Sequence, residues 1–358
     1  MVTVHGSGFS AVSESLAYLQ CRFNGSVVRA QLVSESSIVC NSTEADAGHV
    51  AVEVSGNGRD FSSSGVRYEF VSVLVSEVVP WTGPELGGTV VTLSGVGFVD
   101  VGLRCRFGSM ELVGATVSST SEVRCVSPVS VQTGWLGVEL VSDGESLSSG
   151  GSFFVHSRVW VSSLTPLLGP VEGGTRLTVL GSHFRETSTL RCRFEESSAT
   201  VVARFVDSSE VECATPAASG SGSRVVEVSM NGQQFSASGV AFTYQPSLSV
   251  SSVWPERGVA EGGSMVTVHG SGFSAVSEGL GYLQCRFNGS VVRASLVSST
   301  AVVCNSTEAA AGHVALEVSG NGLDFSSSGV QYEFVTVLVS EVLPWTCLLY
   351  TSPSPRDS

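Results

Sequence analysis

Hydrophobic and polar residues alternate along many short stretches of this chain, and the alternation predicts β-strands. Leu190, Cys192 and Phe194 occupy every second position of one such stretch. Because successive side chains of a strand point to opposite faces, these three would share one buried face. Val211 and Cys213 repeat the pattern one strand later, so a two-sided sheet structure is favoured over helices.

Turn signals separate these stretches, and Gly169-Pro170 is predicted to be one such turn. The pair Asn231-Gly232 predicts a two-residue hairpin, because both of its residues readily adopt a positive φ. Short strands with turn signals about every 8–12 residues are typical of an immunoglobulin-like β-sandwich. The sequence therefore predicts an all-β fold with about seven strands in each domain. Equivalent pairs stand at Asn57-Gly58, Asp143-Gly144 and Asn321-Gly322.

Alignment of the chain on itself divides it into tandem units. Residues 1–82 match residues 265–346 without gaps, with 13 differences and 69 identities. Two more divergent units lie between these copies, which a duplicated three-domain block would explain. The predicted domains are 1–71, 72–157, 158–246 and 247–335, and residues 336–346 begin a further repeat.

Both ends of the chain interrupt the repeat. Met1 aligns with Met265 in the middle of a unit, so we expect the first domain to lack its opening strand. For the same reason we expect that Met1 is not an original start. The repeat register is lost after Thr346, and residues 347–358 resemble a translated sequencing adapter. We interpret this tail as a library artefact; a natural divergent C-terminus is the alternative.

A fixed order of small motifs recurs in the units. In the third unit the motif residues are Pro166, Gly169, Gly173-Gly174-Thr175, Gly181-Ser182-His183-Phe184, Cys192-Arg193-Phe194, Cys213 with Pro216, and Asn231-Gly232. This order resembles that of IPT/TIG domains, the immunoglobulin-like domains of plexins and some transcription factors. The third unit departs at His183, where the others have glycine. The first and fourth units lack the proline that follows the second cysteine. The resemblance covers residues 1–346 and implies tandem E-set β-sandwiches that bind protein partners.

The cysteines fall into pairs. Of the nine, Cys347 belongs to the tail, and the other eight lie two to a unit. This spacing predicts one disulfide per domain and an oxidising compartment. Buried free thiols in a reduced protein are the alternative, and zinc is disfavoured because no Cys-x-x-Cys occurs. The predicted pairs are Cys21/Cys40, Cys105/Cys125, Cys192/Cys213 and Cys285/Cys304.

Four glycosylation sequons agree with passage through a secretory compartment. Because of the duplication they amount to two independent occurrences of the motif. The acceptor asparagines are Asn24, Asn41, Asn288 and Asn305.

The charge and the remaining motifs argue against several classes of function. With 18 basic and 32 acidic residues, a net charge of −14 disfavours binding to nucleic acid or anionic membranes. No apolar run is long enough to span a membrane. The six histidines form no metal-binding motif, and no Gly-x-Ser-x-Gly elbow occurs. We therefore expect no enzyme activity, no cofactor and no metal.

The sequence also predicts contacts for two sets of residues, a group of tryptophans and a group of arginines. Trp81, Trp254 and Trp345 are interpreted as one shared position beside a proline, where neighbouring domains pack or where a ligand stacks. The arginines of the Cys-Arg-Phe strands should point outward and pair with acids on neighbouring strands. These arginines are Arg22, Arg106, Arg193 and Arg286.

The favoured function is a secreted or cell-surface recognition or adhesion protein, whose domains bind protein partners and act as spacers. A membrane anchor would then lie outside this fragment. One alternative is an intracellular transcription-factor module that dimerises and contacts DNA. Another is an accessory region of a secreted carbohydrate-active enzyme. The fold resemblance alone does not decide among these.

Overall fold

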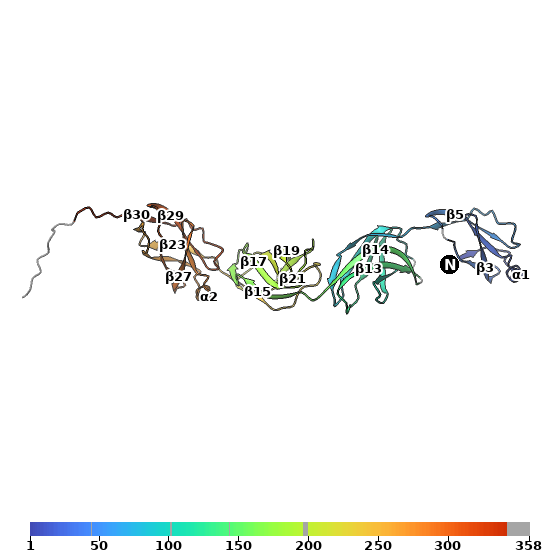
Figure 1. The fold of residues 1–358 in the computed structure, drawn as a ribbon, viewed down its shortest axis with the longest axis horizontal. Coiled ribbons are helices and arrows are strands. Elements are labelled where there is room, and N and C mark those ends of the chain that lie inside the picture. Colours follow the sequence, from blue (N-terminus) through green and yellow to red (C-terminus); the bar gives the residue numbers. More distant parts are fainter. Residues whose placement is uncertain (44, 101, 143, 196–199, 342–358) are drawn as a thin grey trace, which may run out of the picture. The chain divides into compact units, whose positions relative to one another are not determined.

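The chain forms successive all-β domains, whose strands are coloured along the sequence in Figure 1. The structure is a computed structural model that describes all residues except 44, 101, 143, 196–199 and 342–358. The chain separates into two compact units, Met1–Ser157 and Arg158–Ser358, each containing two domains. Residues 342–346 of the expected further repeat, and all of the tail 347–358, lie outside the described residues.

The third domain is a sandwich of two layers. One layer contains β15, β17, β20 and the second half of β19; the other contains the first half of β19 with β18, β21, β22 and β16. The strand β19 therefore passes from one layer to the other. The strands are β15 (Trp160–Thr165), β16 (Leu168–Pro170), β17 (Arg176–Ser182), β18 (Arg191–Phe194), β19 (Thr200–Asp207), β20 (Glu210–Ala214), β21 (Gly222–Ser229) and β22 (Ala241–Gln245).

The second and fourth domains repeat this eight-strand order. The second consists of β7 (Leu74–Val79), β8 (Thr82–Pro84), β9 (Val90–Val96), β10 (Arg104–Phe107), β11 (Val113–Ser119), β12 (Glu122–Val126), β13 (Gly134–Ser142) and β14 (Glu145–His156). The fourth consists of β23 (Ser249–Trp254), β24 (Arg257–Val259), β25 (Met265–Ser271), α2 (Ala275–Gly279), β26 (Gln284–Phe287), β27 (Ser290–Ser298), β28 (Ala301–Asn305), β29 (Gly312–Ser319) and β30 (Gln331–Val335).

The first domain has six strands in the order β1-β4-β3-β2-β5-β6. By register, β1 corresponds to β25 and β6 to β30, so the described residues contain no counterpart of β23 or β24. Its elements are β1 (Val2–His5), α1 (Ala11–Ser15), β2 (Gln20–Phe23), β3 (Ser26–Ser34), β4 (Ser37–Cys40), β5 (Gly48–Ser55) and β6 (Arg67–Phe70).

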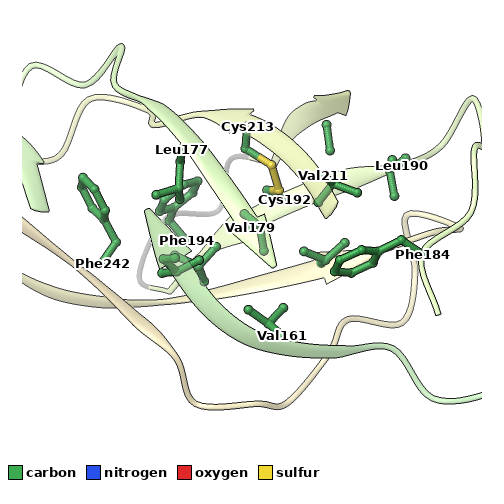
Figure 2. Close-up of a cluster of buried hydrophobic side chains, with 14 of the residues drawn as sticks. Val161, Leu177, Val179, Phe184, Leu190, Cys192, Phe194, Val211, Cys213 and Phe242 are labelled. Carbon is green, nitrogen blue, oxygen red and sulfur yellow. A yellow bond between two sulfur atoms is a disulfide. The ribbon is translucent and has the colours of Figure 1, made fainter. Parts of the chain in front are cut away.

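The core of each domain lies between its layers and follows the alternation read from the sequence. In the third domain Leu177 and Val179 point inward from β17, and Phe194 points inward from β18 (Figure 2). Each is 1% exposed or less, so the apolar face of each strand leaves water almost completely. The buried Tyr244 packs edge-on against Phe194, and its hydroxyl donates to the Pro216 carbonyl oxygen at 2.9 Å.

A disulfide joins the two layers of each domain. In the third domain it links Cys192 on β18 to Cys213 on β20, with the two Cα atoms 6.4 Å apart (Figure 2). These strands belong to opposite layers, and both cysteines are buried. The bond therefore holds the sandwich together through its centre. The corresponding bonds are Cys21–Cys40, Cys105–Cys125 and Cys285–Cys304.

One stretch that the sequence indicated as a turn forms a strand. Residues 168–170 make β16, which pairs in parallel with β22. The sequence signal was misleading because Gly169 and Pro170 are typical turn residues. Gly169 is required here by packing, since an added Cβ would lie 2.4 Å from Oγ1 of Thr175. This short strand raises the count from about seven strands to eight.

Removing the central disulfide should destabilise one domain selectively. We expect replacement of Cys192 and Cys213 by alanine together to cost the third domain about 3 kcal/mol, since the bond closes a loop of 21 residues. Hydrogen exchange followed on peptides from β17 and β20 would measure the change. Exchange in the first domain serves as the internal control, and unchanged exchange in the third would contradict this role.

Candidate interaction surfaces

Asn-Gly pairs form two different kinds of turn. At Asn24-Gly25 and Asn288-Gly289 both residues have positive φ, and the flanking residues pair directly, as Phe23 does with Ser26. These are true two-residue hairpins. At Asp143-Gly144 the pairing of Ser142 with Glu145 also closes a two-residue loop, although residue 143 itself lies outside the described residues.

The two-residue hairpin predicted at Asn57-Gly58, Asn231-Gly232 and Asn321-Gly322 is wrong. Only the glycine of each of these pairs has a positive φ in the structure. The oxygen of the Asn321 side chain instead accepts from the backbone N–H groups of Leu323 and Asp324, at 3.0 and 2.8 Å. Asparagine thus forms its own side-chain turn within a wider loop, across which Ser319 pairs with Phe325.

The sequon asparagines lie at two exposed places in each of the near-identical domains. Asn24 and Asn288 form the tips of the two-residue hairpins. Asn41 follows β4 directly, and Asn305 is the last residue of β28. All four are exposed, so the fold leaves each acceptor side chain accessible to solvent.

The arginines of the Cys-Arg-Phe strands pair with glutamates across the sheet, as expected. Arg193 Nη2 lies 2.6 Å from Glu227 Oε2, and its guanidinium stacks 4.0 Å from the centre of the Phe235 ring. The sequence analysis did not predict that the Phe235 ring stacks on this arginine. Phe61 and Phe325 stack in the same way on the arginines of the first and fourth domains.

The second domain keeps this ion pair, and Leu147 stands where the third domain has Phe235. Arg106 donates to Glu139, and this hydrogen bond lowers the pKa of the Glu139 carboxyl below its usual value. Ser146 also donates to Glu139, at 3.1 Å. Because these side chains remain partly exposed, we interpret the pairs as local supports of the sheet surface and not as binding sites.

The three tryptophans that the sequence seemed to align do not share one position. Trp254 ends β23, where it pairs with Thr267; Val79 holds the equivalent place in β7, opposite Thr92. Trp81 instead follows the proline, between β7 and β8. The interpretation failed because Trp254 precedes its neighbouring proline, Pro255, whereas Trp81 follows Pro80. Trp345 lies outside the described residues.

Trp254 does not bury its ring in the structure, since 71% of it is exposed. Trp81 packs within its own domain, where its ring centre lies 5.5 Å from that of Trp135 with the planes 20° apart. The expected packing of a shared tryptophan between neighbouring domains is therefore wrong for Trp254. For Trp81 the structure shows packing with aromatic side chains of the second domain.

These side chains form an aromatic row, defined as Trp81, Trp135 and Phe154, across the edge of the second domain. Trp135 on β13 pairs with Phe154 on β14, and the Phe154 N–H donates to the Trp81 carbonyl oxygen at 2.7 Å. Both indole rings lie edge-on to the Phe154 ring, with centres 5.3 and 6.5 Å away. Phe154 is only 8% exposed, whereas Trp135 remains 60% exposed. The stacked pair therefore presents a rigid apolar surface to solvent.

The other full domains have different side chains at these places. Strand register puts Thr243 and Ser223 at the Phe154 and Trp135 positions of the third domain. In the fourth domain the same positions hold Glu333 and His313. Polar side chains therefore suit the fold at this edge, and the aromatic row is not a requirement of the sandwich.

Hydrogen bonds join the third and fourth domains within the second compact unit. The Thr175 hydroxyl donates to the Asp324 carboxylate at 2.6 Å, and the same carboxylate accepts from Asn321 at 2.6 Å. Gln245 forms hydrogen bonds with Ser274, the N-cap residue of α2, and with Ser277 within α2, at 3.4 and 3.3 Å. We call these hydrogen-bonded residues, Thr175, Gln245, Ser274, Ser277, Asn321 and Asp324, the joint.

Some kinds of site are not found in the part of the chain that the structure describes. There, no three His, Cys, Asp or Glu side chains are grouped so that they could hold a metal ion. None of the helices in these described ranges has the length and apolar character needed to cross a membrane.

Comparison with known proteins identifies the repeated unit. The IPT/TIG domain matches residues 1–70, 74–155, 160–244 and 248–334. Human fibrocystin-L is 26% identical over 290 residues, covering 77% of this chain and 6% of that protein. Plexin A3 of Danio rerio is 29% identical over 220 residues, covering 57% of this chain and 11% of that protein. The chain thus spans a small part of these relatives.

Among solved structures, the plexin A4 full extracellular region is similar, with 16% identity and a TM-score of 0.43. The match covers 88% of this chain and 35% of that one. Disulfides persist in oxidising compartments, and this chain has one in every domain. The chain is an extracellular or cell-surface module, and it belongs to the IPT/TIG domain family, of which it contains four tandem copies.

Proposed function

We propose that this chain is a non-catalytic recognition segment that binds a protein partner through the aromatic row of the second domain. The observation that supports this most directly is the stacked pair of Trp81 and Trp135, in which Trp135 is 60% exposed and Trp81 partly buried. Tryptophan is enriched among the side chains that dominate binding energy at protein interfaces. The pair is held in place by Phe154, so little conformational entropy is lost when a partner covers it.

The position of this surface also supports a binding role. The positions of Trp135 and Phe154 hold polar side chains in the third and fourth domains, so these two aromatic side chains are not needed to complete a sandwich. A solvated aromatic surface carries a cost in solubility unless a partner covers it. The relatives include plexins, and plexin A4 is represented by its extracellular region, which agrees with a role outside the cell.

The remaining domains act as a spacer in this proposal. The joint between the third and fourth domains limits their relative motion, because Asp324 is engaged by both domains at once. The DNA-contact alternative is disfavoured by the net charge of −14. One observation also supports a carbohydrate partner, since stacked indole rings can bind sugar rings. The binding experiment below distinguishes a protein partner from a carbohydrate partner.

Replacing Trp135 should abolish most of the binding. We expect Trp135→Ser to weaken binding of the labelled chain to animal cell surfaces by about tenfold or more. Flow cytometry over a concentration series would measure it. Trp254→Ser is the matched control, because that exposed ring lies in another domain and should leave binding unchanged.

The same cells can show whether the bound partner is a protein or a carbohydrate. Mild trypsin treatment should remove it, whereas glycosidase treatment should not. Binding that survives trypsin but is lost after glycosidases would favour the carbohydrate alternative. Equal binding by Trp135→Ser and the parent chain would refute the role of the aromatic row.

Breaking the joint should loosen the spacer. We expect Asp324→Ala to broaden the distribution of distances between spin labels placed on the third and fourth domains, because the Thr175 bond is lost. Pulsed electron paramagnetic resonance would measure the distribution. Asp60→Ala removes the matching turn bond from Asn57 in the first domain, and should leave this distribution unchanged. An unaltered distribution in Asp324→Ala would show that the joint does not restrain the pair.

The sequons give a test of secretion. We expect the chain secreted from animal cells to carry glycans at Asn24, Asn41, Asn288 and Asn305, so that peptide N-glycosidase lowers its mass. The substitutions Ser26→Ala and Ser290→Ala should remove the glycans at the hairpin tips while keeping the asparagines that the positive φ favours. An unchanged mass after enzyme treatment would contradict the prediction.

A further inference from the structure

Two large apolar side chains of the fourth domain point away from its core. Trp254 ends β23 and is 71% exposed, and Met265 begins β25 and is 68% exposed. Contiguous apolar surface on the outside of a soluble domain marks a place where another molecule binds. The neighbours of these two side chains in the sheet indicate which molecule covers them.

Strand register places the two side chains on one face. Trp254 pairs with Thr267, and Met265 lies two residues before Thr267 on the same strand. Because successive side chains of a strand alternate between faces, Met265 shares a face with Thr267 and is the diagonal neighbour of Trp254. The inward positions next to them, Val253 and Val266, are buried. The indole and the thioether are therefore neighbours on the outer face of the layer.

A sequon asparagine lies next to them on the same face. Met265 pairs directly with Asn305, the exposed last residue of β28. Residues directly opposite each other in an antiparallel pair have Cβ atoms about 5 Å apart. Asn305 follows the buried Cys304, so its side chain points to the outer face, as that of Met265 does. A glycan on Asn305 therefore begins beside Met265, with Trp254 as the next apolar neighbour.

Hydrogen bonds hold the sequon in place beside this surface. The Ser306 N–H donates to the Ser264 carbonyl oxygen at 2.9 Å, and the Ser264 N–H donates to Ser306 Oγ at 3.1 Å. The hydroxyl oxygen of Thr307, the third residue of the sequon, is buried. The residues that follow Asn305 are thus bound to the residue that precedes Met265. The attachment point of a glycan is fixed with respect to the apolar surface.

The other full domains do not combine these side chains. Neither the second nor the third domain contains a sequon. At the positions of Trp254, Met265 and Asn305, the third domain has Thr165, Arg176 and Ala214, and the second has Val79, Val90 and Val126. Among the full domains, the indole and the thioether therefore occur together with the sequon.

A following domain does not cover this face. The third domain is followed by the fourth within one compact unit. Its residues at the three positions, Thr165, Arg176 and Ala214, are nevertheless exposed. The face is therefore open to solvent where a next domain is present, and its cover in the fourth domain comes from another source.

The carbohydrate of an N-linked glycan suits such a surface. Its first sugars are N-acetylglucosamine residues, which have apolar C–H faces and acetyl methyl groups beside their hydroxyls. Packing of these groups on an indole and a thioether removes apolar surface from water, while the hydroxyls stay solvated. Because the glycan is covalently attached, the contact is intramolecular and loses little translational freedom.

We propose that the glycan on Asn305 lies against Met265 and Trp254 and covers this face of the fourth domain. The inference rests on the glycosylation predicted above and does not involve the aromatic row. Since the second domain has no sequon, its exposed indole stays open to a partner. The exposed indole of the fourth domain is instead closed by the carbohydrate of the chain itself.

Methionine oxidation measures this cover. The full chain is secreted from animal cells, treated briefly with hydrogen peroxide and digested, and the sulfoxide of Met265 is quantified by mass spectrometry. Because oxidation of a methionine depends on its access to solvent, we expect Met265 to oxidise at least about twofold faster in Asn305→Gln. Hydroxyl-radical labelling of Trp254 should rise in parallel. Removing the glycan from the folded parent chain with peptide N-glycosidase gives the same comparison without a substitution.

The other sequon of the domain provides a matched control. Ser290→Ala removes the glycan at Asn288, which lies at a hairpin tip, and leaves Asn305 intact. This variant should leave oxidation of Met265 unchanged. Met110 of the second domain is the internal reference in every sample.

The same digests separate the two ways in which the proposal can fail. An unmodified Asn305 would show that the glycosylation prediction is wrong, and the cover would be lost with it. A modified Asn305 whose removal leaves oxidation of Met265 unchanged would refute the cover alone. An equal increase in Ser290→Ala would also refute it, because the protection would then not come from the neighbouring glycan.

Discussion

Each full domain depends on one segment that supplies the strands at both ends of its strand order. In the third domain, residues 160–170 supply β15 to one layer and β16 to the other. The same stretch thus closes both edges of the sandwich and covers the core. The fourth domain has the same arrangement, with β23 and β24 at the two ends of its strand order, and there Tyr332 and Phe334 are each 1% exposed or less.

Much of the fold could be predicted because its signals are local. Alternation of apolar residues identifies buried strand faces over four or five positions, and Phe194 and Cys192 lie where it placed them. The failures involve residues whose role is set by distant partners. Gly169 belongs to a strand because of β22, and Asn321 caps its own turn instead of forming a hairpin. His183 stands where other units have glycine and keeps the positive φ of that position.

The candidate surfaces were harder to predict for a related reason. The arginine of each Cys-Arg-Phe strand could be expected to meet an acid, since residues on neighbouring strands face one another. The aromatic row could not, because Trp81, Trp135 and Phe154 are far apart in sequence and meet only through the β13-β14-β8 order. Features shared by all four domains describe the fold, whereas this row distinguishes one domain from the others. Differences between repeats are therefore the more informative guide to function.

The joint illustrates how such differences arise from shared parts. Asp60 and Asp324 occupy the same place in near-identical domains, and each accepts a hydrogen bond from the asparagine three residues before it. The turn thus uses this carboxylate within its own domain. In the fourth domain the same carboxylate also accepts from Thr175, so the contact between domains adds one donor to a group already held in position. Because the acceptor is pre-organised, the restraint costs little further entropy. Restraint of this junction therefore needs only one added donor, the Thr175 hydroxyl, on a turn whose acceptor is already in place.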